Sequence, residues 1–170
     1  MNSKDRLITL WEEELPSFIN CIRAIPEDQS AYTPNPKTRT AKEIVEHIIG
    51  HPADVIEAIN DGCMHHRFAT PVSNFNTAAD EFESDSREVI KKLKNTDENT
   101  WNNKIITFYL FGQEYPDLSL SLRDISWRLF RDMIHHRGQL STYYRPMGVR
   151  NPVVYGVTRE IMDEMMASKN

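Results

Sequence analysis

Apolar residues recur every three or four positions along four long stretches of the chain. This is the spacing of α-helices that bury one face against a core. The four predicted helices cover residues 4–24, 40–60, 77–95 and 121–144. The second begins with Thr40 and Glu43, a capping-box pair that can satisfy free backbone N–H groups at a helix start. Four helices with apolar stripes predict an all-α fold, a four-helix bundle.

Two prolines lie inside these predicted helices, Pro16 in the first and Pro52 in the second. Proline has no backbone N–H and its ring clashes with the preceding turn, so each is expected to kink its helix. Gly62 lies just past the second helix, where glycine commonly adopts the left-handed conformation that ends a helix.

The segments between these helices have weaker patterns. Residues 26–39 are rich in turn-forming residues and predict a long connection, and residues 61–75 are predicted to form a loop. The β-prone sequence KIITFYL predicts a short strand or an extended arm within residues 104–118. A short C-terminal helix is expected at about 158–167. No composition shift or linker divides the chain, so residues 1–170 are predicted to form a single domain.

Composition and charge restrict the functions that we expect. Of the 170 residues, 39% are hydrophobic and 26% are charged, which is typical of a globular protein. The net charge is −5 and no run of Lys or Arg exceeds two residues, so nucleic-acid binding is not expected. No apolar run is long enough to span a membrane, and the first residues lack the pattern of a secretory signal. Cys21 and Cys63 have no metal-binding spacing, so a cytoplasmic protein is expected.

Polar side chains interrupt the apolar stripes of the second and fourth predicted helices. On the fourth, Asp132 and His136 lie four residues apart, and on the second His47 and His51 have the same spacing. Side chains four residues apart project from one helix face, with Cβ atoms about 6 Å apart. A buried carboxylate without a partner is costly, and a divalent cation would offset that cost with neutral imidazoles as further ligands. The two pairs therefore suggest a metal site between facing helices.

A structural role is the alternative for each of these residues. A histidine on an apolar face is often a hydrogen-bonded core residue, and Asp132 can pair with a nearby arginine or with His136. His135 should point about 100° away from His136, because an α-helix has about 3.6 residues per turn, which favours a surface or supporting role. Surface positions are also expected for His65, His66 and the three glutamates at residues 12–14.

The fourth predicted helix contains HHRGQ followed by Tyr-x-Arg-x-x-Gly, within the segment DMIHHRGQLSTYYRPMG. The second predicted helix contains TAKEIVEHIIG, and NPVVYG follows the last bundle helix. Together these segments resemble the DinB/YfiT-like family of metal-dependent proteins, and the resemblance covers most of the chain. The HHRGQ segment is its most specific part. The resemblance implies a four-helix bundle with a long crossover connection, often assembled as a homodimer.

The resemblance also implies a divalent metal held by one histidine of the second helix and two residues four apart on the last. By position these are His47, Asp132 and His136, and most family members have histidine where this chain has Asp132. Two histidines and a carboxylate suit zinc, nickel, iron or manganese, with coordination positions left open. His51 and His135 are weaker candidates, and His51 could be a fourth ligand or a partner of a ligand.

The residues around the predicted ligands have two interpretations. Arg137 and Gln139 flank the ligand face but should point partly away from the metal. Gly138 would permit the close approach of another helix, and Tyr143 and Arg145 could line the mouth of the pocket. The alternative for all five is helix packing, capping or a dimer interface.

An open metal position suggests a metal-dependent enzyme. The resemblance extends to thiol-dependent transferases and isomerases of the wider family, which use low-molecular-weight thiols such as bacillithiol or mycothiol. It implies activation of a small thiol for transfer to an electrophile, and hydrolysis by an activated water is a close competitor. The alternative is a non-catalytic bundle that binds a metal or a small ligand, which Asp132 at a usual histidine position favours.

Overall fold

The computed structural model describes residues 1–168, and within them the chain is mostly helical with one small sheet. The helices are α1 (Ser3–Arg23), α2 (Ala41–Ile48), α3 (Gly50–Asp61), α4 (Phe75–Asn95), α5 (Glu98–Asn103), α6 (Leu122–Ser141) and α7 (Arg159–Ala167). Two 3₁₀ turns are η1 (Glu27–Gln29) and η2 (Pro116–Leu118). The strands are β1 (Cys63–His65), β2 (Ile105–Leu110), β3 (Gln113–Glu114) and β4 (Leu120–Ser121).

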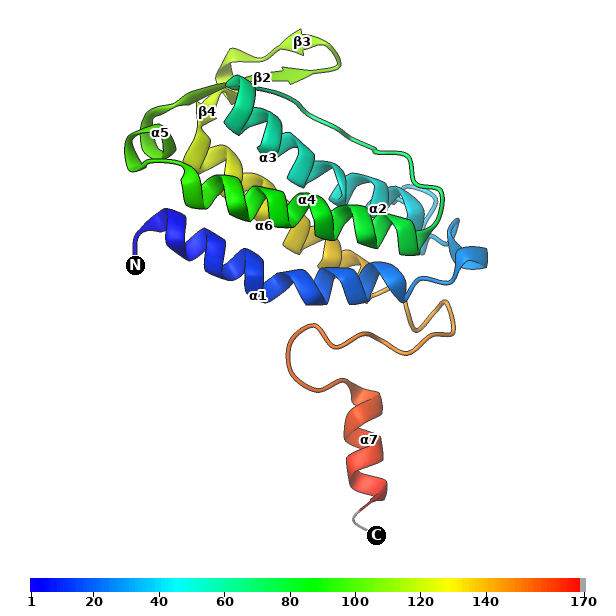
Figure 1. Cartoon of the computed structure of the whole chain (residues 1–170). Coiled ribbons are helices and arrows are strands. Elements are labelled where there is room, and N and C mark those ends of the chain that lie inside the picture. Colours follow the sequence, from blue (N-terminus) through cyan, green and yellow to red (C-terminus); the bar gives the residue numbers. More distant parts are fainter. Residues whose placement is uncertain (169–170) are drawn as a thin grey trace.

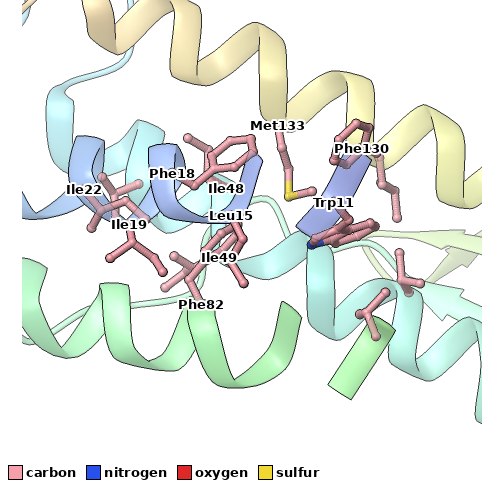
Figure 2. Close-up of a cluster of buried hydrophobic side chains, with 14 of the residues drawn as sticks. Trp11, Leu15, Phe18, Ile19, Ile22, Ile48, Ile49, Phe82, Phe130 and Met133 are labelled. Carbon is pink, nitrogen blue, oxygen red and sulfur yellow. The ribbon is translucent and has the colours of Figure 1, made fainter. Parts of the chain in front are cut away.

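The long helices pack around one apolar core (Figure 1). Helix α1 lies against α4 and α6, α3 lies against the same two helices, and α2 contacts α6. Figure 2 shows a cluster of their buried side chains, in which the labelled residues are Trp11, Leu15, Phe18, Ile19, Ile22, Ile48, Ile49, Phe82, Phe130 and Met133. Fully burying a large apolar side chain contributes about 1.5–3 kcal/mol. This core therefore holds α6 firmly against α2 and α3, the helices that carry the predicted ligands.

A small sheet lies at one end of the helices and corrects the all-α prediction. Strand β2 pairs in parallel with β1 and antiparallel with β3 and β4. The strand expected within residues 104–118 is confirmed by β2, whereas β1 lies in residues 61–75, which were predicted as a loop. Three residues are too few to show an alternating pattern, and the partner of β1 is the distant segment Thr107–Tyr109. Pairing between segments so far apart leaves no local signal in the sequence.

The two prolines affect their helices differently. Helix α1 continues through Pro16, so the predicted kink does not interrupt it. The second predicted helix divides at Ile49 into α2 and α3. Pro52 has no N–H to donate to the carbonyl of Ile48, so the break falls one turn before the proline. Gly62 ends α3 in the left-handed region with φ 73°, as predicted.

The C-terminal helix α7 stands away from the packed helices (Figure 1), and none of its side chains is buried. It confirms the helix expected at about 158–167. Arg145 pairs with Glu160, and Arg150 pairs with Glu164. These contacts connect α7 to the segment that follows α6.

Candidate metal site

The predicted ligand pairs meet in the space between α2–α3 and α6. His47 on α2 and His51 on α3 remain neighbours despite the break at Ile49, with ring centroids 4.6 Å apart. The carboxylate of Asp132 faces these two rings and the ring of His136, one turn further along α6. Its Oδ2 atom is 3.1 Å from His47 Nε2, 2.8 Å from His51 Nε2 and 3.4 Å from His136 Nε2. Three histidines therefore converge on one carboxylate oxygen.

The hydrogen bonds of His47 favour a cation at this position. Its Nδ1 lies 3.0 Å from the backbone carbonyl oxygen of Phe68, which can only accept, so Nδ1 carries the proton. In the neutral ring Nε2 then has a lone pair, and it faces an oxygen of Asp132 at 3.1 Å. Burial lowers the pKa of His47, although its hydrogen bond to Asp132 opposes this, so a second proton is disfavoured. A metal ion is the alternative that satisfies both acceptors.

His136 has the same arrangement. Its Nδ1 is 2.7 Å from Gln139 Oε1, so this nitrogen donates and Nε2 presents a lone pair. The amide of Gln139 is fixed in turn by a contact of 3.1 Å between its Nε2 and His135 Nε2. The lone pair of His136 faces a guanidinium nitrogen of Arg39 at 3.3 Å. His135 is exposed and contacts the amide of Gln139, which fits the supporting role considered for it.

His51 is the most deeply buried of the three rings, with 0% of its surface exposed. Its Nδ1 has no hydrogen-bond partner among the described residues, and the nearest acid, Asp54 Oδ2, is 3.9 Å away. Burial lowers the pKa of His51, but its interactions with Asp132 and Asp54 raise it more, and the net shift is upward. His51 is therefore the histidine best placed to donate a proton to Asp132.

Asp132 remains ionised in this environment. Burial raises the pKa of its carboxyl group, but hydrogen bonds to His136, His47 and His51 lower it well below its usual range. The side chain is still 40% exposed, because its outer side faces open space. An anionic oxygen surrounded by imidazole nitrogens and accessible from solvent has the properties of a metal ligand.

A second carboxylate, Asp54, lies behind the first and was missed in the sequence. It is fully buried, with its Oδ2 2.8 Å from His66 Nδ1 and its Oδ1 2.6 Å from Arg67 Nη1. The prediction that His66 lies at the surface is therefore wrong, whereas His65 is exposed as expected. Asp54 follows His51 by three residues on the same helix, and that spacing was the available signal.

Among residues 1–168, three groups of side chains have possible ligand atoms within 4.8 Å of one another. They are His47–His51–Asp132, His51–Asp54–His66 and Glu57–Cys63–His65. The first contains two predicted residues together with the weaker candidate His51, and His136 lies beside it without joining the compact trio. Asp54 of the second is already paired with Arg67. The first group is therefore the best candidate for a metal site, and His136 remains a predicted ligand.

The buried pairing of Asp54 predicts a loss of stability in acid. Burial raises its pKa, but hydrogen bonds to His51, His66 and Arg67 lower it from the ordinary 3.8 to about 2. Because the folded-state pKa lies below the unfolded one, this stability is present above pH 4 and is lost as the pH falls toward 2. We expect a loss of about 2 kcal/mol over this window. Urea unfolding of wild type and Asp54→Asn at pH 5 and pH 2.5 would measure it, and an equal pH dependence in both would contradict the assignment.

A cleft of about 1880 Å³ opens over the first group. His47, Asp132 and His136 line it together with Tyr143, whose hydroxyl donates to the backbone carbonyl of Arg39. Its apolar lining comes from the sheet and the turn η2, namely Met64, Phe108, Leu110, Leu118 and Leu120. The predicted place of Tyr143 in the pocket is confirmed.

Two other predictions about the last helix are wrong. Arg145 does not line this cleft, because its guanidinium pairs with Glu160 of α7. Gly138 does not pack against another helix of residues 1–168, because a Cβ at this position would have none of their heavy atoms within 4 Å. The glycine is exposed on α6.

Arg137 and Glu14 form an ion pair that local sequence patterns do not predict. The Arg137 side chain is 1% exposed, and its Nη1 is 2.6 Å from Glu14 Oε2. Its Nη2 donates to the hydroxyl of Tyr155, which in turn donates to Glu14. Glu14 was expected on a solvated helix face, and this expectation is wrong. Arg137 points away from the site and joins α6 to α1 and to the NPVVYG segment.

The packed helices and the histidine–aspartate cluster define a helical protein with a candidate metal site in an open cleft. The sequence model of the DinB family matches residues 1–166, and the chain belongs to this family. The crystal structure of the DinB-like protein YjoA from Bacillus subtilis is similar, with a TM-score of 0.66 and 20% identity. The similarity covers 88% of this chain and 96% of that chain, which shows a shared fold. No curated protein matches.

None of the helices among the described residues combines the length and apolar character needed to cross a bilayer.

Proposed function

We propose that this DinB-family protein is a divalent-metal-dependent enzyme built as a four-helix bundle. His47, Asp132 and His136 are the proposed ligands, with His51 as a fourth ligand or as the partner of Asp132. The main support is the orientation of two imidazole rings. His47 and His136 each have Nδ1 at a carbonyl oxygen and Nε2 directed at the same carboxylate. Metal-ligating histidines usually have this pattern of outer hydrogen bonds.

The proposed chemistry is the activation of a small thiol, or of water, for transfer or hydrolysis. A divalent ion held here supplies a Lewis acid that makes a thiol or a water molecule more acidic. Phe68 and Gln139 hold the imidazoles in the tautomer that this role requires. Arg39, beside His136, is placed to stabilise an anionic reactant. The substrate is proposed to be a small molecule, and the protein to act as a homodimer in the cytoplasm.

A second candidate is a non-catalytic bundle that binds a metal or a small ligand. It is favoured by the pairing of the site residues with one another. His51 can donate to Asp132, and Arg39 can donate to the lone pair of His136, so most of the cluster is satisfied by the protein itself. Such a site binds an ion less strongly, because these contacts must be broken first.

Metal binding and activity can be tested separately on the same protein. Protein purified without an affinity metal should bind cobalt(II), and His47→Ala should lose most of this binding. The matched control is His65→Ala, which removes an exposed histidine of the third possible ligand group, outside the cleft. It should bind as the wild type does if the first group holds the ion. The loaded protein is then assayed with a reactive electrophile and a panel of thiols, and with ester substrates. Binding without either activity would favour the second candidate, and no binding at all would contradict both metal proposals.

A further inference from the structure

The cations of this acidic protein are distributed unevenly. Most lysines and arginines form ion pairs, but six have no carboxylate partner within residues 1–168. They are Arg6, Lys37, Arg39, Lys104, Arg128 and Arg131. All of them except Lys104 line the cleft over the candidate metal site. The chain has more acidic than basic residues, with a net charge of −5. A shortage of carboxylates therefore does not explain why these cations are unpaired and gathered in one cleft.

The arginines lie close to the histidine–aspartate cluster. Arg39 touches the cluster directly, with its Nη1 3.3 Å from His136 Nε2. Arg128 precedes Asp132 by four residues on α6, so it lies one turn away on the same face. Arg131 lies over the ring of Trp127, with its guanidinium carbon 5.4 Å from the ring centroid. Guanidinium groups thus line the same cleft as the cluster, and one of them contacts it.

The acidic residues of the cleft do not neutralise these cations. The carboxylate of Asp132 contacts three histidines, and the carboxylate of Asp124 pairs with Arg123. A divalent ion at the cluster would add more positive charge than the one carboxylate offsets. The cleft is therefore electropositive, and a low-dielectric wall strengthens such a field. The apolar wall around Phe108 and Leu118 is placed to contact an uncharged part of the same ligand.

We propose that the cleft binds a small organic oxyanion, a molecule with a carboxylate or phosphate group and an apolar portion. Arg39 and Arg128 hold the oxyanion, since a planar guanidinium can donate two parallel hydrogen bonds to such a group. The apolar portion lies against Phe108 and Leu118. The proposal deepens the proposed function by assigning a substrate class to the same site, but anion binding itself does not require the metal.

Calorimetric titration with two simple probes tests this assignment. Wild-type protein should bind 3-phenylpropionate and phenyl phosphate, and the methyl ester of 3-phenylpropionate should bind at least tenfold more weakly (about 1.4 kcal/mol). Added sodium chloride should weaken binding, because it screens the cationic groups. The stronger of the two anions identifies the preferred head group. Failure of both to bind at millimolar concentration would overturn the proposal.

Matched charge removals locate the binding site. Arg39→Gln and Arg128→Gln should each weaken probe binding by about tenfold, since each removes charge-assisted hydrogen bonds. Lys104→Gln removes the one cation outside the cleft that has no carboxylate partner among residues 1–168, and it should change binding by less than about twofold. An equal loss in all three would mean a diffuse charge effect and would overturn the assignment. Melting temperatures verify that each variant is folded. Cobalt titration of the same proteins distinguishes the two proposals. Probe binding without cobalt binding would contradict only the proposed function, and cobalt binding without probe binding would contradict only this inference.

Discussion

Replacing Asp132 by alanine is expected to weaken zinc and cobalt(II) binding by more than about 100-fold. Losing a supporting partner of a ligand typically costs 10–100-fold, and loss of a ligand itself should cost more. Asp132 Oδ2 faces three imidazole nitrogens at 2.8–3.4 Å, so its removal also takes away the charge that attracts a cation. Competition titrations with a chromophoric chelator would give the dissociation constants for wild type and variant.

Asp132→His separates a ligand from a bystander. A histidine at this position recreates the three-histidine set that the family resemblance implies, four residues before His136, and should keep or increase affinity. If Asp132 only orients a histidine through a hydrogen bond, an imidazole would replace it poorly and both variants would bind weakly. Asp124→Ala, which removes another carboxylate of α6, is the control and should change nothing. Equal affinities in all proteins would remove Asp132 from the site.

The ligand cluster could be predicted because helical spacing projects directly into space. His47, His51, Asp132 and His136 lie on two apolar stripes, and facing stripes must meet in a packed core. Spacing alone does not rank these residues by distance. The break at Ile49 and the register between α3 and α6 bring His51 to 2.8 Å from Asp132, closer than His136. That order depends on packing between distant segments.

Residues that act through distant segments could not be assigned from local patterns. His66 was predicted to be a surface loop residue. Its environment comes from the pairing of β1 with β2 and from the buried Asp54, and neither leaves a local signal in the sequence. The basic cleft was also hidden, since its cations are scattered along the chain and form no run. Arg137 belongs to the HHRGQ segment that carries the resemblance, yet its contacts are with Glu14 of α1 and with Tyr155 of the NPVVYG segment. The conspicuous motif thus contains a residue of the candidate metal site, His136, and a structural residue, Arg137, side by side.

Arg137→Ala is expected to lower the free energy of unfolding by about 3 kcal/mol, because breaking a buried ion pair leaves its partner uncompensated. The partner is Glu14, held at 2.6 Å. The guanidinium carbon also lies 4.4 Å from the centroid of the Phe18 ring, so a cation–π contact and its packing are lost as well. Urea unfolding followed by circular dichroism would measure the change.

Arg145→Ala is the matched control for Arg137→Ala. Arg145 also belongs to the motif and also forms an ion pair, but its side chain is exposed and solvent screens the pair with Glu160. Its loss should leave the free energy of unfolding nearly unchanged. A similar small effect for both variants would mean that Arg137 is not a structural anchor. A large effect of Arg137→Ala, with cobalt affinity retained in the folded variant, would show that the arginine of HHRGQ supports the helices and is not needed for metal binding.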